Sequence, residues 1–157
     1  MKKQQSGFTM IELIMVIVIL GILAAFALPR FADFGADARV STVNGIGGAL
    51  RSAAAIAHAQ QLVDGGAHNA SVTLEGQTIT MIGGFPTANT AGIVAAAQVD
   101  SVEISTGGAT AGSQITFTPS GGSASCQVAY TAATPAGADP STDPAVSYSV
   151  EVTDTGC

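Results

Sequence analysis

An unbroken apolar run, LIMVIVILGILAAFAL, extends over residues 13–28. Together with residues 8–12 it contains about 20 residues, which is the length of a helix that crosses the hydrocarbon core of a bilayer. Lys2 and Lys3 precede the run, and positively charged residues favour the cytoplasmic side of a membrane. The sequence therefore predicts a membrane-inserted helix whose C-terminal side is delivered outside the cytoplasm.

One carboxylate, Glu12, lies at the start of this otherwise apolar segment. A charge at the centre of a membrane helix costs roughly 2.5–3.5 kcal/mol on insertion scales, so such a residue indicates a function and a partner. A cleaved secretory signal and a plain signal anchor are alternative interpretations of the segment. The first finds only a weak small-x-small site, AFA, at residues 25–27. Neither alternative explains Glu12.

The stretch KKQQSGFTMIEL resembles the type IV prepilin signature, a short basic leader that ends in Gly and is followed by Phe and an acid at the fifth position after the cut. The residues in register are Gly7, Phe8, Thr9, Glu12 and Leu13. The resemblance implies that prepilin peptidase cuts between Gly7 and Phe8 and that the new amine of Phe8 is N-methylated. The apolar helix then stays in the mature subunit.

The same resemblance suggests a role for Glu12. In a filament of such helices, its carboxylate can meet the Phe8 amine of a neighbouring subunit. An isolated charge in a core of low dielectric costs far more than a paired one, so we expect this pair to fix the axial offset between helices that could otherwise slide. In the alternative interpretations, Glu12 reaches the lipid headgroups or serves only in recognition by the peptidase.

Two residues are expected to interrupt the helix, namely Gly21 and Pro29. Glycine weakens a helix, and proline removes a donor and clashes with the preceding turn. The span between them is therefore the one expected to lose helical hydrogen bonds. The resemblance to pilins implies an extended segment there in the assembled filament, and a simple kink is the alternative for a single subunit.

Residues 30–63 continue as an amphipathic helix, because apolar residues recur at intervals of three or four. This face comprises Phe31, Phe34, Ala38, Val43, Ile46, Leu50, Ala53 and Ile56 or Ala57. The charged and polar residues expected off it are Asp33, Asp37, Arg39, Arg51 and Gln60. Three glycines, Gly45, Gly47 and Gly48, predict a bend or a close backbone approach in the middle of this segment.

Residues 64–157 are expected to form an antiparallel β head. SVTLEGQTITMIG predicts a hairpin with its turn at Gly76–Gln77, and a short helix is expected near residues 90–98. Further strands are predicted in SVEIS, QITFTP, CQVAYTA and VSYSVEVTD. The predicted fold class is α+β, with a long N-terminal helical stem packed on the head, as in the ladle fold of type IV pilins. The expected divisions are a leader at 1–7, a membrane or filament-core half-helix at 8–29, an outer half-helix at 30–63 and the head at 64–157.

The chain has 2 cysteines, Cys126 and Cys157. Export into an oxidising compartment favours a disulfide between them. Its loop of roughly 30 residues makes it worth about 3–4 kcal/mol in the chain-entropy model. Two unpaired thiols are the alternative.

Composition and motifs argue against several functions. With a net charge of −6 and 5 Lys and Arg, the chain lacks the clustered cations that nucleic-acid binding requires. His58 and His68 are expected to be solvent-facing or satisfied polar residues, and Asp139 and Asp143 to belong to a solvated loop rather than to a calcium site. No catalytic motif, metal motif or phosphate loop is found, so we expect no enzyme and no cofactor.

The stretches ALPRFADFGADAR and GGFPTANTAGIVAA, with the Cys pair, resemble mannose-sensitive haemagglutinin (MSHA) pilins of Gram-negative bacteria. The resemblance implies a pilus subunit that mediates attachment and biofilm formation, held in the inner membrane before assembly and extracellular afterwards. Its implied partners are further copies of the chain, prepilin peptidase, the pilus assembly machinery and a surface receptor or glycan. The alternatives are a type II secretion pseudopilin or minor pilin, and a membrane-anchored ectodomain that does not polymerise.

Overall fold

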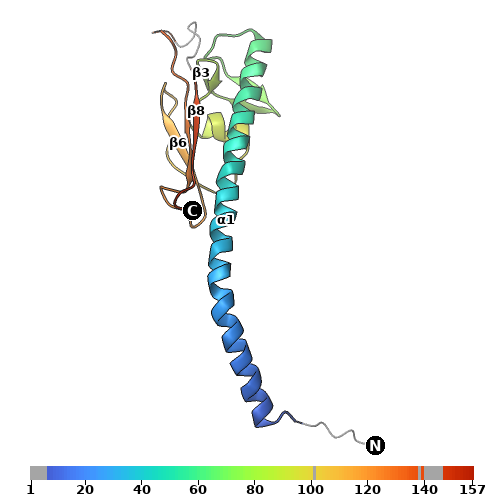
Figure 1. Cartoon of the computed structure of the whole chain (residues 1–157). Helices are drawn as coiled ribbons and strands as arrows, with labels where there is room; N and C mark the ends of the chain where they lie inside the picture. Colours follow the sequence, from blue (N-terminus) through green and yellow to red (C-terminus); the bar gives the residue numbers. More distant parts are fainter. Residues whose placement is uncertain (1–6, 101, 138, 140–146) are drawn as a thin grey trace, which may run out of the picture. The chain divides into compact units, whose positions relative to one another are not determined.

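The computed structural model describes residues 7–100, 102–137, 139 and 147–157, without the side chains of residues 28, 29 and 31–33. The chain divides into two compact units, Met1–Asp37 and Ala38–Cys157. One helix, α1 (Met10–Asp64), contributes residues to both units (Figure 1). The two units are described separately below.

The first unit is the N-terminal part of α1 and the residues before it. Helix α1 is continuous through Gly21 and Pro29, so the predicted interruption is wrong for the single chain. A glycine or a proline weakens a helix locally by about 1 or 3 kcal/mol, respectively, and the many turns on either side keep their own hydrogen bonds. An extended segment in an assembled filament stays a prediction.

The second unit is built on a four-stranded antiparallel sheet with strand order β5-β6-β7-β8. Its strands are β5 (Val102–Ile104), β6 (Gln114–Pro119), β7 (Gln127–Thr131) and β8 (Ser149–Thr153), and all four lie within predicted strands. Alternate residues of the two central strands point inward, with Ile115 and Phe117 on β6 and Val128 and Tyr130 on β7 fully or almost fully buried. This period of two follows from the pleat.

The rest of the second unit consists of two small hairpins and a short helical segment. The elements are β1 (Val72–Leu74), β2 (Gln77–Ile79), β3 (Met81–Ile82), β4 (Phe85–Pro86), the π-helical turn η1 (Thr90–Val94) and α2 (Ala95–Ala97). The first hairpin is confirmed, but its turn is Glu75–Gly76, both with positive φ, because Leu74 pairs with Gln77. The predicted second run splits after Ile79, and β3 pairs with β4 in a hairpin that was not predicted.

The core of the second unit lies between the C-terminal part of α1 and the sheet. In Figure 1 the strands run alongside this part of the helix. The buried hydrophobic residues of the helix recur every three or four positions and are Val43, Ile46, Leu50, Ala53, Ala54 and Ala57. The predicted face is therefore confirmed from Val43 onward, with Ala57 and not Ile56 as its last member, since Ile56 is 59% exposed. Ala38, also a predicted member of this face, is exposed. Phe34, in the first unit, is also exposed.

Gly47 is the predicted close approach. A Cβ added at Gly47 would lie 2.7 Å from Cγ2 of Val152 on β8. At Gly45 and Gly48 an added Cβ would meet nothing within 4 Å. Only the middle position of the three is therefore required by packing within the chain.

Tyr130 is the largest fully buried side chain, and its hydroxyl donates a hydrogen bond of 2.7 Å to the carbonyl oxygen of Pro86. Burial, with a smaller contribution from Tyr148, raises the pKa of this hydroxyl. The bond satisfies the polar end of a side chain that otherwise fills the core.

Candidate processing and assembly segment

Residues Gly7, Phe8 and Thr9 precede α1 and have no regular secondary structure. The side chain of Phe8 is 86% exposed, and a Cβ added at Gly7 would meet nothing within 4 Å. A peptidase must bind an accessible, extended substrate. The Gly7–Phe8 bond has this accessibility in the structure, and its cleavage stays a prediction.

Glu12 lies in the first turn of α1 and forms a capping box with Thr9. The main-chain N–H and the hydroxyl of Thr9 donate to Oε2 of Glu12 over 2.8 and 2.6 Å. The N–H of Glu12 in turn donates to Oγ1 of Thr9 over 3.4 Å. The carboxylate thus satisfies donors that a helix start leaves unpaired, and it lies where the helix dipole favours a negative charge.

The capping box was not among the predicted features, although the sequence contains its signature. Thr9 is followed three residues later by Glu12 and then by an apolar run, which is the Ser/Thr-x-x-Glu pattern of a helix start. This pattern gives Glu12 a role within its own chain, in addition to the predicted role between chains. The described residues make no hydrogen bond to its Oε1 atom.

The helix beyond Glu12 exposes apolar side chains on every side. Within the described residues, Met10–Ala27 is the stretch that is long and apolar enough to cross a membrane, as judged by length and composition. Leu13, Ile17, Leu20 and Leu23 are each more than half exposed. A helix that is hydrophobic all round must bury its surface in lipid or against other proteins. Within the described residues of this unit, these apolar side chains are therefore left uncovered.

The C-terminus of the second unit is held by a disulfide and an arginine. Cys126 and Cys157 are joined, as predicted, by a disulfide of 2.02 Å. Nε of Arg39 on α1 donates to the carbonyl oxygen of Cys157 over 2.7 Å. The side chain of Arg51, one of the residues expected off the apolar face, donates to the carbonyl oxygen of Val150 over 3.0 Å. Two arginines of α1 thus bind main-chain oxygens of residues 150 and 157. Local sequence patterns do not reveal these contacts.

The remaining residues considered in the sequence are His58, His68, Asp139 and Asp143. Nδ1 of His58 is hydrogen-bonded to the carbonyl oxygen of Gly84, which satisfies one of its two ring nitrogens. Asp139 has a partner in the structure, and Asp143 lies outside the described residues. Among the residues that the structure describes, no three His, Cys, Asp or Glu side chains are grouped as metal ligands would be.

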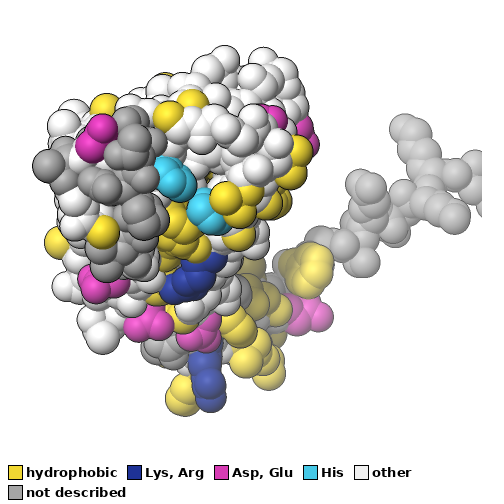
Figure 2. Space-filling view, turned by 90° about the horizontal axis from the view of Figure 1, so that it is seen from above, with side chains coloured by type: hydrophobic (Ala, Val, Ile, Leu, Met, Phe, Trp, Pro, Cys, Tyr) yellow, Lys and Arg dark blue, Asp and Glu magenta, His cyan; other side chains and the backbone are white. Residues whose placement is uncertain are grey.

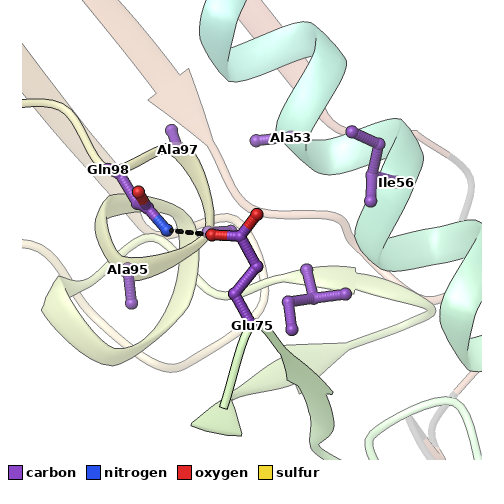
Figure 3. Close-up of a pocket in the computed structure, with 8 residues that line it drawn as sticks. Ala53, Ile56, Glu75, Ala95, Ala97 and Gln98 are labelled. Carbon is purple, nitrogen blue, oxygen red and sulfur yellow. Dashed lines mark hydrogen bonds between the residues drawn. The ribbon is translucent and has the colours of Figure 1, made fainter. Parts of the chain in front are cut away.

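A shallow groove of about 300 Å³ lies beside α1 in the second unit (Figure 3). It is lined by Ala53, Ile56, Leu74, Glu75, Ala95, Ala96, Ala97 and Gln98. Glu75 is the one ionisable residue of this lining, and its Oε2 accepts a hydrogen bond of 2.9 Å from Nε2 of Gln98. A single carboxylate among alanines provides no acid–base pair and no nucleophile with its base.

The comparisons with known proteins concern the N-terminal segment most directly. Residues 2–28 carry the prokaryotic N-terminal methylation motif. Gly7, Phe8, Thr9 and Glu12 lie within this motif. They form the accessible Gly7–Phe8 peptide bond and the capping box described above. The described part of the motif thus coincides with the exposed apolar residues at the start of α1.

Three curated relatives carry pilus or fimbrial names. The chain is 53% identical over 55 residues to the type IV narrow pilus major component PilA5 of Thermus thermophilus, covering 35% of this chain and 47% of the relative. It is 37% identical over 102 residues to the type IV major fimbrial protein FimA of Dichelobacter nodosus, covering 59% and 60%. It is 34% identical over 85 residues to the fimbrial protein EcpC of Eikenella corrodens, covering 52% and 56%.

The chain spans about half to three-fifths of the length of these three relatives. No solved structure matches it. The relatives over which the chain aligns are thus named as major components of a type IV pilus or fimbria in two cases and as a fimbrial protein in the third. The methylation motif, the apolar helix followed by antiparallel sheets, and the disulfide agree with that likeness.

Proposed function

We propose that this protein is a structural subunit of a type IV pilus that polymerises through its N-terminal helix. One observation carries the proposal most directly: Met10–Ala27, which lies within the methylation motif and contains the capped Glu12, exposes apolar side chains on all sides. A subunit with this surface is stable in a membrane as a monomer. In water it is stable only when copies of the helix cover one another.

In this proposal, prepilin peptidase cuts between Gly7 and Phe8 and the new amine is methylated. Thr9 stays in the mature chain, so cleavage keeps both donors of the capping box. Oxygen Oε2 of Glu12 is then held by its own chain, and Oε1, which accepts no hydrogen bond from the described residues, can accept one from a donor of a neighbouring copy. The Phe8 amine of a neighbouring copy supplies that donor, which pairs the charge in the filament core and fixes the axial offset.

The capping box also lowers the cost of holding Glu12 near the membrane before assembly. Two hydrogen bonds and the start of the helix stabilise the carboxylate within the monomer. In this proposal, subunits that await assembly are held by Met10–Ala27 in the inner membrane of a Gram-negative cell, with the second unit outside the cytoplasm. On assembly, the segment between Gly21 and Pro29 becomes extended as the helices are drawn together.

The finer assignment is an MSHA-like pilus that mediates surface attachment and biofilm formation. The stretches ALPRFADFGADAR and GGFPTANTAGIVAA support it by resemblance, and the disulfide-linked C-terminus supports a subunit with an exposed, mechanically loaded head. Receptor binding then belongs to the outer surface of the second unit.

The test is mass spectrometry of the N-terminus of protein sheared from the cell surface, combined with electron microscopy of the same fraction. We expect fibres whose main subunit begins at N-methylated Phe8. Intact residues 1–7 on an exported product would contradict the proposal and favour a membrane-anchored ectodomain. A processed N-terminus without abundant surface fibres would instead favour a pseudopilin or a minor pilin.

A further inference from the structure

The turn between β3 and β4 is held by two histidines that are distant from it in sequence. The main-chain N–H of Gly84 donates to the carbonyl oxygen of His68 over 2.7 Å. The carbonyl oxygen of Gly84 lies 2.7 Å from Nδ1 of His58 on α1. Both side chains are partly exposed, and Figure 2 shows two histidine side chains next to each other on this face.

The orientation and the tautomer of His58 are fixed by its neighbours. Its ring stacks on Phe85 with a centroid distance of 4.4 Å and an interplanar angle of 12°. Because a carbonyl oxygen can only accept, Nδ1 must carry the proton that is donated to Gly84. The lone pair of a neutral His58 is therefore on Nε2. Metal-binding histidines characteristically have this arrangement, with the other ring nitrogen donating to a main-chain carbonyl.

Gln61 provides an independent sign that this turn is suited to a positive ligand. It is 3% exposed, and its Oε1 atom is buried without a hydrogen-bond partner among the described residues. Its Nε2 donates to the carbonyl oxygens of Ala67 and Ala70, which anchors the loop that carries His68. A Cβ added at Gly84 would lie 3.3 Å from Oε1 of Gln61 and 3.2 Å from Nδ1 of His58. An unpaired buried oxygen at the same glycine adds negative potential to the site.

We propose that the imidazoles of His58 and His68 bind a divalent transition-metal ion such as Zn²⁺, Ni²⁺ or Cu²⁺ on the surface of the second unit. Imidazole nitrogen selects these ions, whereas Ca²⁺ and Mg²⁺ prefer oxygen ligands. Two protein ligands leave the remaining positions to solvent, so the site is exchangeable rather than structural. The acidic chain, with a net charge of −6, attracts cations to it. This inference does not depend on polymerisation.

The experiment is a Zn²⁺ titration of the full chain in detergent micelles, followed by calorimetry. We expect binding that His68→Gln weakens roughly tenfold or more, because it removes one of two ligands. The matched control is Asn69→Ala, at an exposed neighbouring position, which should leave the affinity unchanged. Excess Mg²⁺ should not compete. Equal affinity of the wild-type chain and His68→Gln would overturn the proposal.

A second measurement, made on the wild-type chain, does not depend on whether a histidine variant folds correctly. His58→Gln also removes the stacking on Phe85, so a loss of binding in that variant alone would not decide the question. Pulsed electron paramagnetic resonance of the wild-type chain with one equivalent of Cu²⁺ counts coordinated imidazoles directly. Two imidazoles in the wild-type chain and one in His68→Gln are expected. One or none in the wild-type chain would refute a two-histidine site.

Discussion

The two parts of α1 have opposite environments although they belong to one helix. In the second unit, Leu50 is fully buried against the sheet. In the first unit, Leu20 and Phe26 are 58% and 75% exposed. The second part is buried in a core with the sheet of its unit, whereas the described apolar side chains of the first part are exposed. The second part of α1 is therefore stabilised by packing within its unit, whereas the apolar surface of Met10–Ala27 requires lipid or other protein copies to cover it.

The largest effect is expected from changing Glu12, the one carboxylate of the apolar segment at residues 8–28. Glu12→Ala removes both the capping acceptor and the proposed partner of the Phe8 amine. We expect the subunit to be exported and cleaved but filaments to be lost, as measured by electron microscopy and immunoblotting of sheared and membrane fractions. Glu12→Gln keeps an acceptor for Thr9 but not the charge, so it should also fail to assemble. Normal piliation in either variant would refute the charge-pairing role.

Within the second unit, the buried face of α1 should respond to substitutions that its exposed face tolerates. Leu50→Ala should lower the free energy of unfolding by about 2–5 kcal/mol, because it leaves a cavity in the core. Leu62→Ala is the matched control on the same helix, since Leu62 is 63% exposed, and it should change stability by less than about 0.5 kcal/mol. The near-ultraviolet circular dichroism of Tyr130 and Tyr148 during denaturation of the full chain in detergent measures both. Equal losses would contradict the assigned core face.

The disulfide between Cys126 and Cys157 is expected to contribute to the stability of the second unit. Cys126 and Cys157 are separated by 31 residues, which gives a loop worth roughly 3–4 kcal/mol in the chain-entropy model. The double variant Cys126→Ser/Cys157→Ser should therefore unfold at lower denaturant by the same spectroscopic measure. Binding of the C-terminus by Arg39 should keep the last strand paired. Unchanged stability after reduction would show that the disulfide adds nothing to the head.

Much of the fold followed from local patterns in the sequence. The apolar run, the three-to-four spacing from Val43 to Ala57 and the alternation in QITFTP each correspond to an element or a face in the structure. These patterns are predictive because a helix and a strand repeat their faces every few residues. Glu12 was noticed as a lone acid in an apolar run, whereas Gly7 and Phe8 were identified by resemblance to the prepilin signature and not by periodicity.

The parts that escaped prediction depend on contacts that are distant in sequence. Arg39 and Arg51 bind the main chain 118 and 99 residues away, and His58 binds the turn at Gly84. No periodicity encodes such pairs. The β3–β4 hairpin was missed for a different reason, since its strands have two residues each and show no alternation. The capping box of Thr9 and Glu12, by contrast, was readable from the sequence and was overlooked.

The smallest expected effects come from two adjacent glycines of α1. Gly48→Ala should stabilise the second unit by up to about 1 kcal/mol, because alanine favours a helix and the added methyl group meets nothing within 4 Å. Gly47→Ala gains the same propensity but overpacks against Val152 of β8. Overpacking typically costs about 1–3 kcal/mol, so a net loss is expected in the same denaturation experiment. If both variants were stabilised, β8 would have to yield at Val152, and the buried face of this part of α1 would be less tightly packed than the structure indicates.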